Sequence, residues 1–247
     1  MANLTVFIFL IFALTLSSAE NKITARIVGG SEAQEEQFPY QVSLFDLFTG
    51  HFCGGSILNE NWIITAGKCV QGKRPSSFYV GAGITNWSDL PYAIYQIGKV
   101  VVHDSQNIAL IKLKEPLTFT AILNKIDLPT ENKNVDSTPV VISGWGSKTK
   151  GGPTSRKLLF LNTKIVDVNT CKEHMSTLPS YPAITDENLC TFTRGGQGLC
   201  DGDSGNPVVS GNYLVGVSLY GYPCAQGYPD VSANVWNYIE WIKSHIN

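Results

Sequence analysis

The segment 199–207 reads Leu199-Cys200-Asp201-Gly202-Asp203-Ser204-Gly205-Asn206-Pro207. It places one serine hydroxyl in a turn made mostly of small residues. In such a turn the backbone N–H groups of Gly202 and Ser204 can point at one spot and stabilise a developing oxyanion. A serine hydroxyl is a weak nucleophile by itself, so it needs a base within hydrogen-bonding distance and a group that orients the base. The remaining sequence decides whether those two groups are present.

Length and charge narrow the classes of function. The chain has 247 residues, which suffices for one large domain or two small ones. Its formal net charge is −2 and it contains no run of basic residues. A nucleic acid is therefore not an expected partner. No metal-ligand cluster or cofactor motif is recognised either, so we expect no cofactor and no metal.

The amino terminus predicts secretion. Residues 6–16 are almost purely apolar and Ser17-Ser18-Ala19 offers small residues for cleavage, so residues 1–19 are interpreted as a signal peptide. The apolar run is too short to span a bilayer, and no later run is longer, so we expect no membrane association. Six cysteines remain after removal of this segment, an even number that fits three disulfides in a secreted, extracellular protein.

Several further motifs resemble one family. Segment 202–207 resembles the GDSGGP turn of the trypsin- and chymotrypsin-like serine proteases, with Asn206 in place of a glycine. Four other segments resemble motifs of the same family and occur in the family's order. They are Cys53-Gly54-Gly55-Ser56, segment 65–69, segment 107–113 and Gly144-Trp145-Gly146. The resemblance covers essentially everything after residue 26, and a chance match of so many ordered motifs is improbable.

The resemblance implies an all-β fold of two packed antiparallel six-stranded β-barrels, with the site in the seam and a C-terminal α-helix. Hydrophobic periodicity alone supports only an all-β chain of many short strands. We expect an activation propeptide at 20–26 and a peptidase-like domain at 27–247. Within that domain the barrels are expected at about 27–118 and about 130–234, and the helix at 235–247.

The resemblance also implies processing. Arg26 precedes Ile27-Val28-Gly29-Gly30, like the family's activation junction. Cleavage there would free an ammonium on Ile27 that pairs with the carboxylate of Asp203 and orders the serine turn. On the surface, Asn86-Trp87-Ser88 is an N-glycosylation acceptor.

Three disulfides are expected. The family joins the two segments that contain Cys53 and Cys69, so these cysteines are paired here. Cys171 and Cys190 bracket a short segment that we expect to be irregular. The expected pairs are Cys53–Cys69, Cys171–Cys190 and Cys200–Cys224, the last of which brackets the serine turn.

The family's base and its orienting group are both replaced. Lys68 stands where the family has its histidine, and Asn107 stands where it has its aspartate. A solvated lysine titrates near 10.4, so it would need a pKa lowered by about three units to act as a base for Ser204, at a cost of roughly 4 kcal/mol. The remaining histidines are interpreted as surface or packing residues: His51, His103, His174 and His245.

A further substitution concerns a residue that contacts the family's catalytic aspartate. Segment 214–221 aligns without gaps onto the family strand L-V-G-I-V-S-W-G, which puts Leu219 where a serine contacts the family's aspartate. A register with one inserted residue would restore Ser218 but would put Tyr220 where a glycine flanks the pocket. Neither register favours catalysis.

The specificity pocket is expected to be unusual. Gly198 stands where trypsin-like members carry an aspartate, so a preference for Arg or Lys from that position is absent. Asp230 matches a position on the pocket wall that is often glycine, so a purely apolar pocket is not expected. Leu219, Tyr220 and Gly221 form the rest of the expected wall.

The sequence therefore predicts a secreted serine protease homologue without a working triad. Such a protein would act by binding a protein or peptide ligand, such as a protease inhibitor. Two alternatives stay open: an endopeptidase of low or unusual activity that uses Ser204 with Lys68, and an inactive relative that binds carbohydrate. The lack of a basic cluster disfavours the second.

Overall fold

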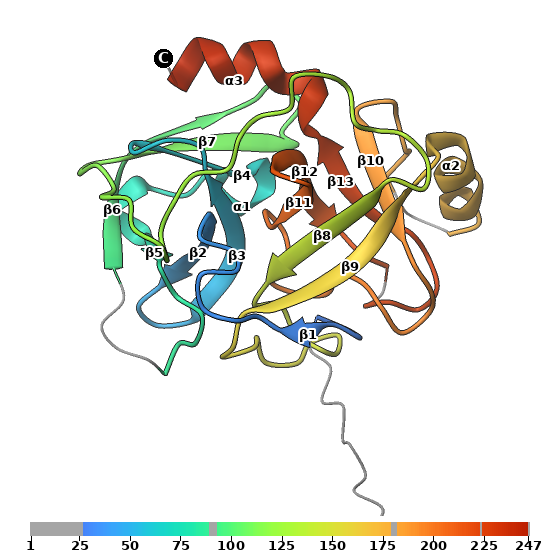
Figure 1. Ribbon diagram of the computed structural model, residues 1–247, viewed down its shortest axis with the longest axis horizontal. Helices are drawn as coiled ribbons and strands as arrows, with labels where there is room; N and C mark the ends of the chain where they lie inside the picture. The colour runs from blue at the N-terminus through green and yellow to red at the C-terminus, as the bar shows by residue number, and fades with distance from the viewer. Residues whose placement is uncertain (1–26, 89–92, 179–181, 223, 247) are drawn as a thin grey trace, which may run out of the picture.

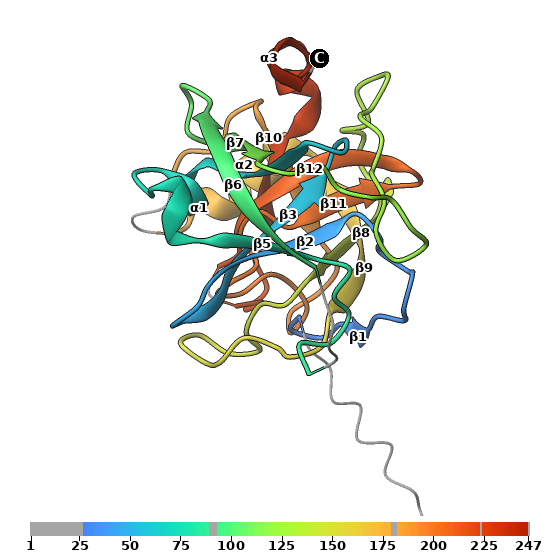
Figure 2. The ribbon, with the colours of Figure 1, turned by 90° about the vertical axis from the view of Figure 1, so that its left-hand side faces the viewer.

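The structure is a computed structural model of the 247-residue chain, and it describes residues 27–88, 93–178, 182–222 and 224–246. The predicted signal peptide and the predicted propeptide with Arg26 lie outside the described residues. Twelve longer strands form two barrels that lie side by side, and β1 adds to the second (Figures 1 and 2).

The first barrel is closed by six antiparallel strands in the order β2-β3-β4-β7-β6-β5. Alternating apolar side chains such as Val42 and Leu44 are fully buried inside it, as expected where one face of each strand turns inward. Its strands are β2 (Gln41–Asp46), β3 (Gly50–Ile57), β4 (Trp62–Ala66), β5 (Tyr79–Ala82), β6 (Ala93–Val102) and β7 (Ile108–Leu113).

The second barrel is closed because β8 pairs with both β9 and β11. The short β1 (Ser31–Glu32) adds to the outer edge of β9, so the beginning of the described chain is tied to the second barrel. Its strands are β8 (Pro139–Gly144), β9 (Leu159–Val166), β10 (Asn188–Phe192), β11 (Pro207–Ser210), β12 (Tyr213–Tyr220) and β13 (Asp230–Asn234). The predicted pair of six-stranded barrels is confirmed.

The carboxyl end is helical, as predicted. It begins with the 3₁₀ turn η2 (Val235–Tyr238), where the side chain of Asn234 accepts a hydrogen bond from the N–H of Trp236, and continues as α3 (Ile239–Ile246). Ile239 and Ile242 of α3 pack into the same apolar cluster as the first barrel, and Figure 1 shows the helix across one end of the molecule. No helix among the described residues has both the length and the apolar character needed to cross a membrane.

The other helical elements are short. They are α1 (Gly67–Val70), η1 (Pro75–Ser77) and α2 (Val168–Ser176). The segment between Cys171 and Cys190 was expected to be irregular, but it contains most of α2 and the start of β10. Asp167 starts α2 because its side chain accepts hydrogen bonds from the N–H groups of Asn169 and Thr170, at 2.9 and 3.0 Å.

Disulfides connect these elements as predicted. The bonds are Cys53–Cys69, Cys171–Cys190 and Cys200–Cys224, and none of the six cysteines is free. The first ties β3 to α1, which carries Lys68. The third ties the segment before Ser204 to the chain that follows β12.

Candidate active site

The serine turn is fixed by backbone hydrogen bonds from both barrels. The N–H of Gly54 in β3 donates to the carbonyl of Ser204 at 2.8 Å, and the N–H of Gly205 donates to the carbonyl of Ser218 in β12 at 2.7 Å. Gly205 has a φ of 84°, and a Cβ there would lie 2.3 Å from the carbonyl oxygen of Gly54. Only glycine fits such a close approach in this backbone conformation.

The hydroxyl of Ser204 is engaged by the backbone. Its Oγ donates to the carbonyl oxygen of Leu219 at 2.9 Å. Leu219 lies in an irregularity of the pairing between β12 and β13, so its carbonyl turns toward the serine instead of a partner strand. No side chain of a described residue accepts the Ser204 proton.

The neighbouring backbone offers two hydrogen-bond donors. Gly202 has a φ of 90°, and the N–H groups of Gly202 and Ser204 donate to none of the described residues. Behind them, Nε2 of the buried His51 lies 3.0 Å from the carbonyl oxygen of Gly202, and its Nδ1 lies 2.6 Å from Oγ of Ser43. A carbonyl only accepts, so Nε2 carries the proton and Nδ1 accepts from Ser43. Burial lowers the pKa of His51 to about 4, so the ring is neutral and holds the carbonyl of Gly202 in place.

A cavity of about 390 Å³ opens over the serine. The predicted site residues Lys68, Gly202 and Ser204 line it, as do three of the predicted pocket-wall residues, Leu219, Tyr220 and Gly221. Lys150 from the loop 148–152 lines it as well. Desolvation by the surrounding protein lowers the pKa of Lys68, although its side chain remains exposed. Neither lysine forms an ion pair or hydrogen bond with another described residue. The full lining is Lys68, Lys150, Cys200, Asp201, Gly202, Ser204, Leu219, Tyr220, Gly221, Tyr222 and Cys224.

Asn107 points away from this cavity. Its Nδ2 donates to Oη of Tyr238 at 2.9 Å and lies 3.4 Å from Oε2 of Glu187. The Oη of Tyr238 in turn donates to Glu187 at 3.0 Å. The structure therefore brings Lys68 and Ser204 to one cavity, while Asn107 orients neither of them.

No histidine reaches the serine. All four lie among the described residues, and none lines the cavity. His51 is buried behind the turn, His103 packs edge-on against Tyr238 and Trp241, and His174 and His245 lie in α2 and α3.

Asn206 is the centre of a buried network that the sequence analysis missed. Its Nδ2 donates to Oδ1 of Asp203 at 2.8 Å, and its Oδ1 accepts from Nε2 of Gln41 at 3.2 Å. Gln41 is itself held by Oγ of Ser143, which donates to Oε1 at 2.6 Å. All four residues are buried. Gln41 and Ser143 are far from Asn206 in sequence, so no local pattern indicated them.

The carboxylate of Asp203 lies in the interior, and no cation of a described residue forms an ion pair with it. It accepts from the N–H groups of Gly146 and Cys200, at 2.9 and 3.0 Å, and from Asn206. Burial raises the pKa of Asp203 to about 7 against these hydrogen bonds. Ile27 is fully buried against Leu159 and Leu161, and its φ of 47° is unfavourable for a β-branched residue.

Two residues of the expected specificity pocket, Gly198 and Asp230, lie outside the cavity lining, whereas Gly221 is part of it. A Cβ on Gly221 would lie 2.4 Å from Oδ1 of Asp230, so the carboxyl group packs directly behind that glycine. Its Oδ2 accepts from the N–H of Leu199 at 3.0 Å, while its buried Oδ1 has no described partner. Burial raises the pKa of Asp230 well above its usual range.

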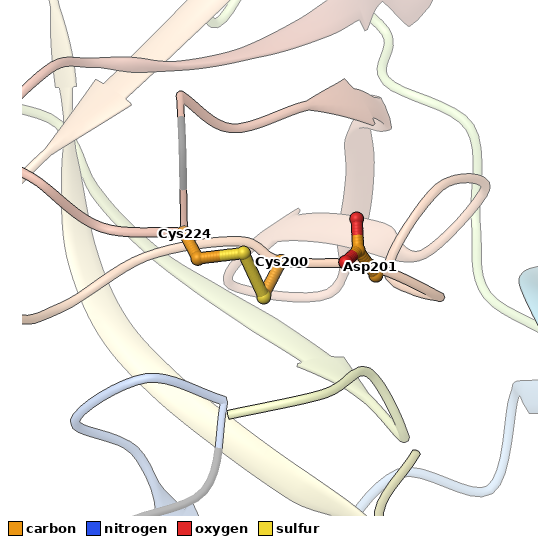
Figure 3. Close-up of side chains that lie close together, drawn as sticks. All are labelled: Cys200, Asp201 and Cys224. Atoms are coloured by element: carbon orange, nitrogen blue, oxygen red, sulfur yellow. A yellow bond between two sulfur atoms is a disulfide. The ribbon is translucent and has the colours of Figure 1, made fainter. Parts of the chain in front are cut away.

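A group of possible ligand atoms lies at the edge of the cavity. Figure 3 shows Asp201 beside the Cys200–Cys224 bond. Both sulfurs are consumed by the disulfide, so neither is a thiolate that would hold a metal. The carboxylate of Asp201 instead accepts from the N–H of Gly151 at 2.6 Å.

The predicted glycosylation site lies away from this cavity. Asn86 is partly exposed, and its Oδ1 accepts from the N–H of Ser88 at 3.1 Å in a turn. Its attachment to a glycan stays a prediction.

Comparison with known proteins agrees with the fold. The Trypsin family profile matches residues 27–242. The chain belongs to the Trypsin family. It is 35% identical to Chymotrypsin-2 of Vespa crabro over 228 residues, which is 89% of this chain and 99% of the hornet protein. It is also 35% identical to Trypsin 5G1 of Aedes aegypti, over 89% of this chain and 85% of that protein, and 34% identical to Trypsin-1 of Astacus astacus, over 89% and 99%.

Trypsin-family membership makes this a protein of the chymotrypsin-fold serine protease class. The cavity over Ser204 is lined by two lysines, Lys68 and Lys150, and by the residues whose backbone N–H groups donate to no described residue, Gly202 and Ser204. The side chains of Asn107, Asp203 and Asp230 all lie outside its lining.

Proposed function

We propose that this protein is a secreted serine protease homologue that does not hydrolyse peptides and acts by binding a protein or peptide ligand at the cavity over Ser204. One observation carries the proposal: the hydroxyl of Ser204 donates to the carbonyl of Leu219, and none of the four histidines lines the cavity. Without a base, the hydroxyl cannot be activated at neutral pH.

Lys68 is a poor substitute for the missing base. A general base must accept a proton, and an ammonium has no lone pair with which to do so. Desolvation lowers the pKa of Lys68, but its exposed side chain keeps contact with water. The outward direction of Asn107 removes the group that would orient a base at that position. These contacts favour a binding protein over a slow Ser-Lys endopeptidase.

Secretion and activation belong to the same proposal. The relatives include proteins named trypsin and chymotrypsin, and three disulfides suit an oxidising compartment. Cleavage after Arg26 would relieve the backbone constraint on Ile27 and supply an ammonium for Asp203.

The test is hydrolysis of casein and of peptide amides by the cleaved protein, with Ser204→Ala as the matched control. We expect equal rates for both. Turnover that depends on Ser204 would establish the endopeptidase instead. Retention on a heparin column at physiological salt would favour the carbohydrate-binding alternative, which the net charge of −2 disfavours.

A further inference from the structure

We propose that the cavity over Ser204 is a carboxylate-binding site, in which the N–H groups of Gly202 and Ser204 hold one oxygen and the ammonium of Lys68 neutralises the charge. This rests on the proposed function, because it requires Lys68 to be a cation and not a base. The ligand is a peptide that presents a carboxylate, either at its C-terminus or on an aspartate or glutamate side chain.

Unused hydrogen-bond donors are the first observation. The N–H groups of Gly202 and Ser204 are adjacent to the same cavity and donate to no described residue. His51 holds the carbonyl of Gly202 from behind at 3.0 Å, which fixes the backbone between the two donors before a ligand arrives. Fixed backbone N–H groups favour an anion, because a hydrogen bond to a charged acceptor is about twice as strong as one to a neutral acceptor.

The second observation is an excess of positive charge in the cavity lining. Lys68 and Lys150 line the cavity, and neither has a described anionic partner. Asp201 is the one carboxylate among the described lining residues and accepts from the N–H of Gly151, so the two lysines outnumber the acidic charge of the lining. The walls desolvate the ammonium of Lys68 in part, which strengthens its attraction to an incoming anion.

The position of Lys68 fits this role better than a structural one. It lies on the four-residue helix α1, which the Cys53–Cys69 disulfide ties to β3. The same strand carries Gly54, whose N–H holds the carbonyl of Ser204 at 2.8 Å. The backbone that carries Lys68 and the turn that carries the N–H donors are thus both attached to β3, which limits the backbone entropy lost when an anion binds.

The test measures binding of fluorescein-labelled hexapeptides by fluorescence polarisation. One arm ends in a free carboxylate, one ends in a primary amide, and one ends in an amide but carries an internal glutamate. Each arm is made with Leu, Phe, Lys or Ala as its last residue. We expect at least one carboxylate peptide to bind about tenfold or more tightly than its amide counterpart.

Substitutions at lysines test whether Lys68 is the source of the preference for a carboxylate. Lys68→Met should abolish the preference for the carboxylate, Lys68→Arg should keep it, and Lys99→Met, on the exposed face of β6, should leave it unchanged. If Lys68→Met fails to fold, loss of the wild-type preference in the Lys68→Gln variant serves the same purpose. Preference for the C-terminal carboxylate or for the internal glutamate identifies the source of the ligand group.

The outcomes separate the two proposals. Equal affinity for carboxylate and amide peptides, or no binding by either, overturns the carboxylate site. In that case an absence of hydrolysis still leaves the inactive homologue standing. Cleavage of the amide peptides that depends on Ser204 overturns the proposed function itself, whatever the affinities are.

Discussion

Asn206 shows how a single residue changes the interior beneath the serine turn. Its amide occupies the space between two glycines, since a Cβ on Gly54 or Gly144 would lie 1.8 Å from it. It joins Gln41 to the carboxylate of Asp203. The Asn206→Ala variant leaves both of these buried groups short of a partner, at about 1–3 kcal/mol for each. We expect the free energy of unfolding, measured by urea denaturation, to fall by about 2–6 kcal/mol.

The matched control is Asn212→Ala in the exposed turn between β11 and β12. It should change the free energy of unfolding by less than about 0.5 kcal/mol. An Asn206→Ala variant as stable as this control would show that the buried amide contributes nothing.

The raised pKa of Asp203 makes the free energy of unfolding depend on pH. An unfolded aspartate titrates near 3.9, whereas burial raises the pKa of Asp203 in the uncut protein to about 7. Between about pH 4 and 7 the folded chain therefore keeps a proton that the unfolded chain has released. This group makes the free energy of unfolding fall with rising pH, by up to about 1.4 kcal/mol per pH unit, and the effect ends above the folded pKa.

The measurement is urea denaturation across pH 4–8 of an uncut form made with Arg26→Gln, compared with the same form carrying Asp203→Asn. The difference between the two should have the stated slope in this window. After cleavage, a new ammonium on Ile27 would lower the pKa of Asp203 and remove the slope. A difference that does not change with pH in the uncut pair would contradict the raised pKa.

At the scale of elements, the segment that leads into β7 sets the direction of Asn107. The motif match identified this position but could not give the direction of its side chain, because that depends on Tyr238 in η2 and Glu187 before β10. Asp230 is a similar case, since its place behind Gly221 follows from how β13 packs and not from spacing. The strands and disulfides were predictable because the motifs fix topology, whereas the Asn206 network and the start of α2 were missed.

The direction of Asn107 limits how far substitutions can restore proteolytic activity. The Lys68→His and Asn107→Asp changes together supply a base and its orienting carboxylate, a pair whose acidic member is worth about 10⁴ in turnover. The hydroxyl of Tyr238, which now donates to Glu187, can donate to the new carboxylate instead and so favours its outward direction, whereas the like charge of Glu187 opposes it. We expect the double variant to gain well under that factor in hydrolysis of peptide amides, and Tyr238→Phe, which removes the outward partner, to increase the gain further.

Ser204→Ala in each background gives the uncatalysed rate. The gain of the double variant should exceed the product of the single gains, because base and orienting group act as a unit. A folded triple variant with intact disulfides and no Ser204-dependent hydrolysis would place the defect in the cavity itself.

At the scale of the whole molecule, the described chain begins packed against the second barrel. β1 is paired with β9, and Ile27 is buried next to that strand. Protein purified from its natural source should begin at Ile27 when sequenced from its amino terminus. A start at Glu20 would mean that the activation junction is not used.

The central claim is that no group in the molecule activates Ser204, and covalent labelling with a fluorophosphonate at a series of pH values tests it most directly. For the cleaved protein we predict slow labelling of Ser204, with a rate that rises steadily with hydroxide concentration and shows no inflection between pH 6 and 9. The Ser204→Ala variant provides the background. Rapid labelling of Ser204 that levels off above an apparent pKa near neutrality would contradict the account and identify a working base in the cavity.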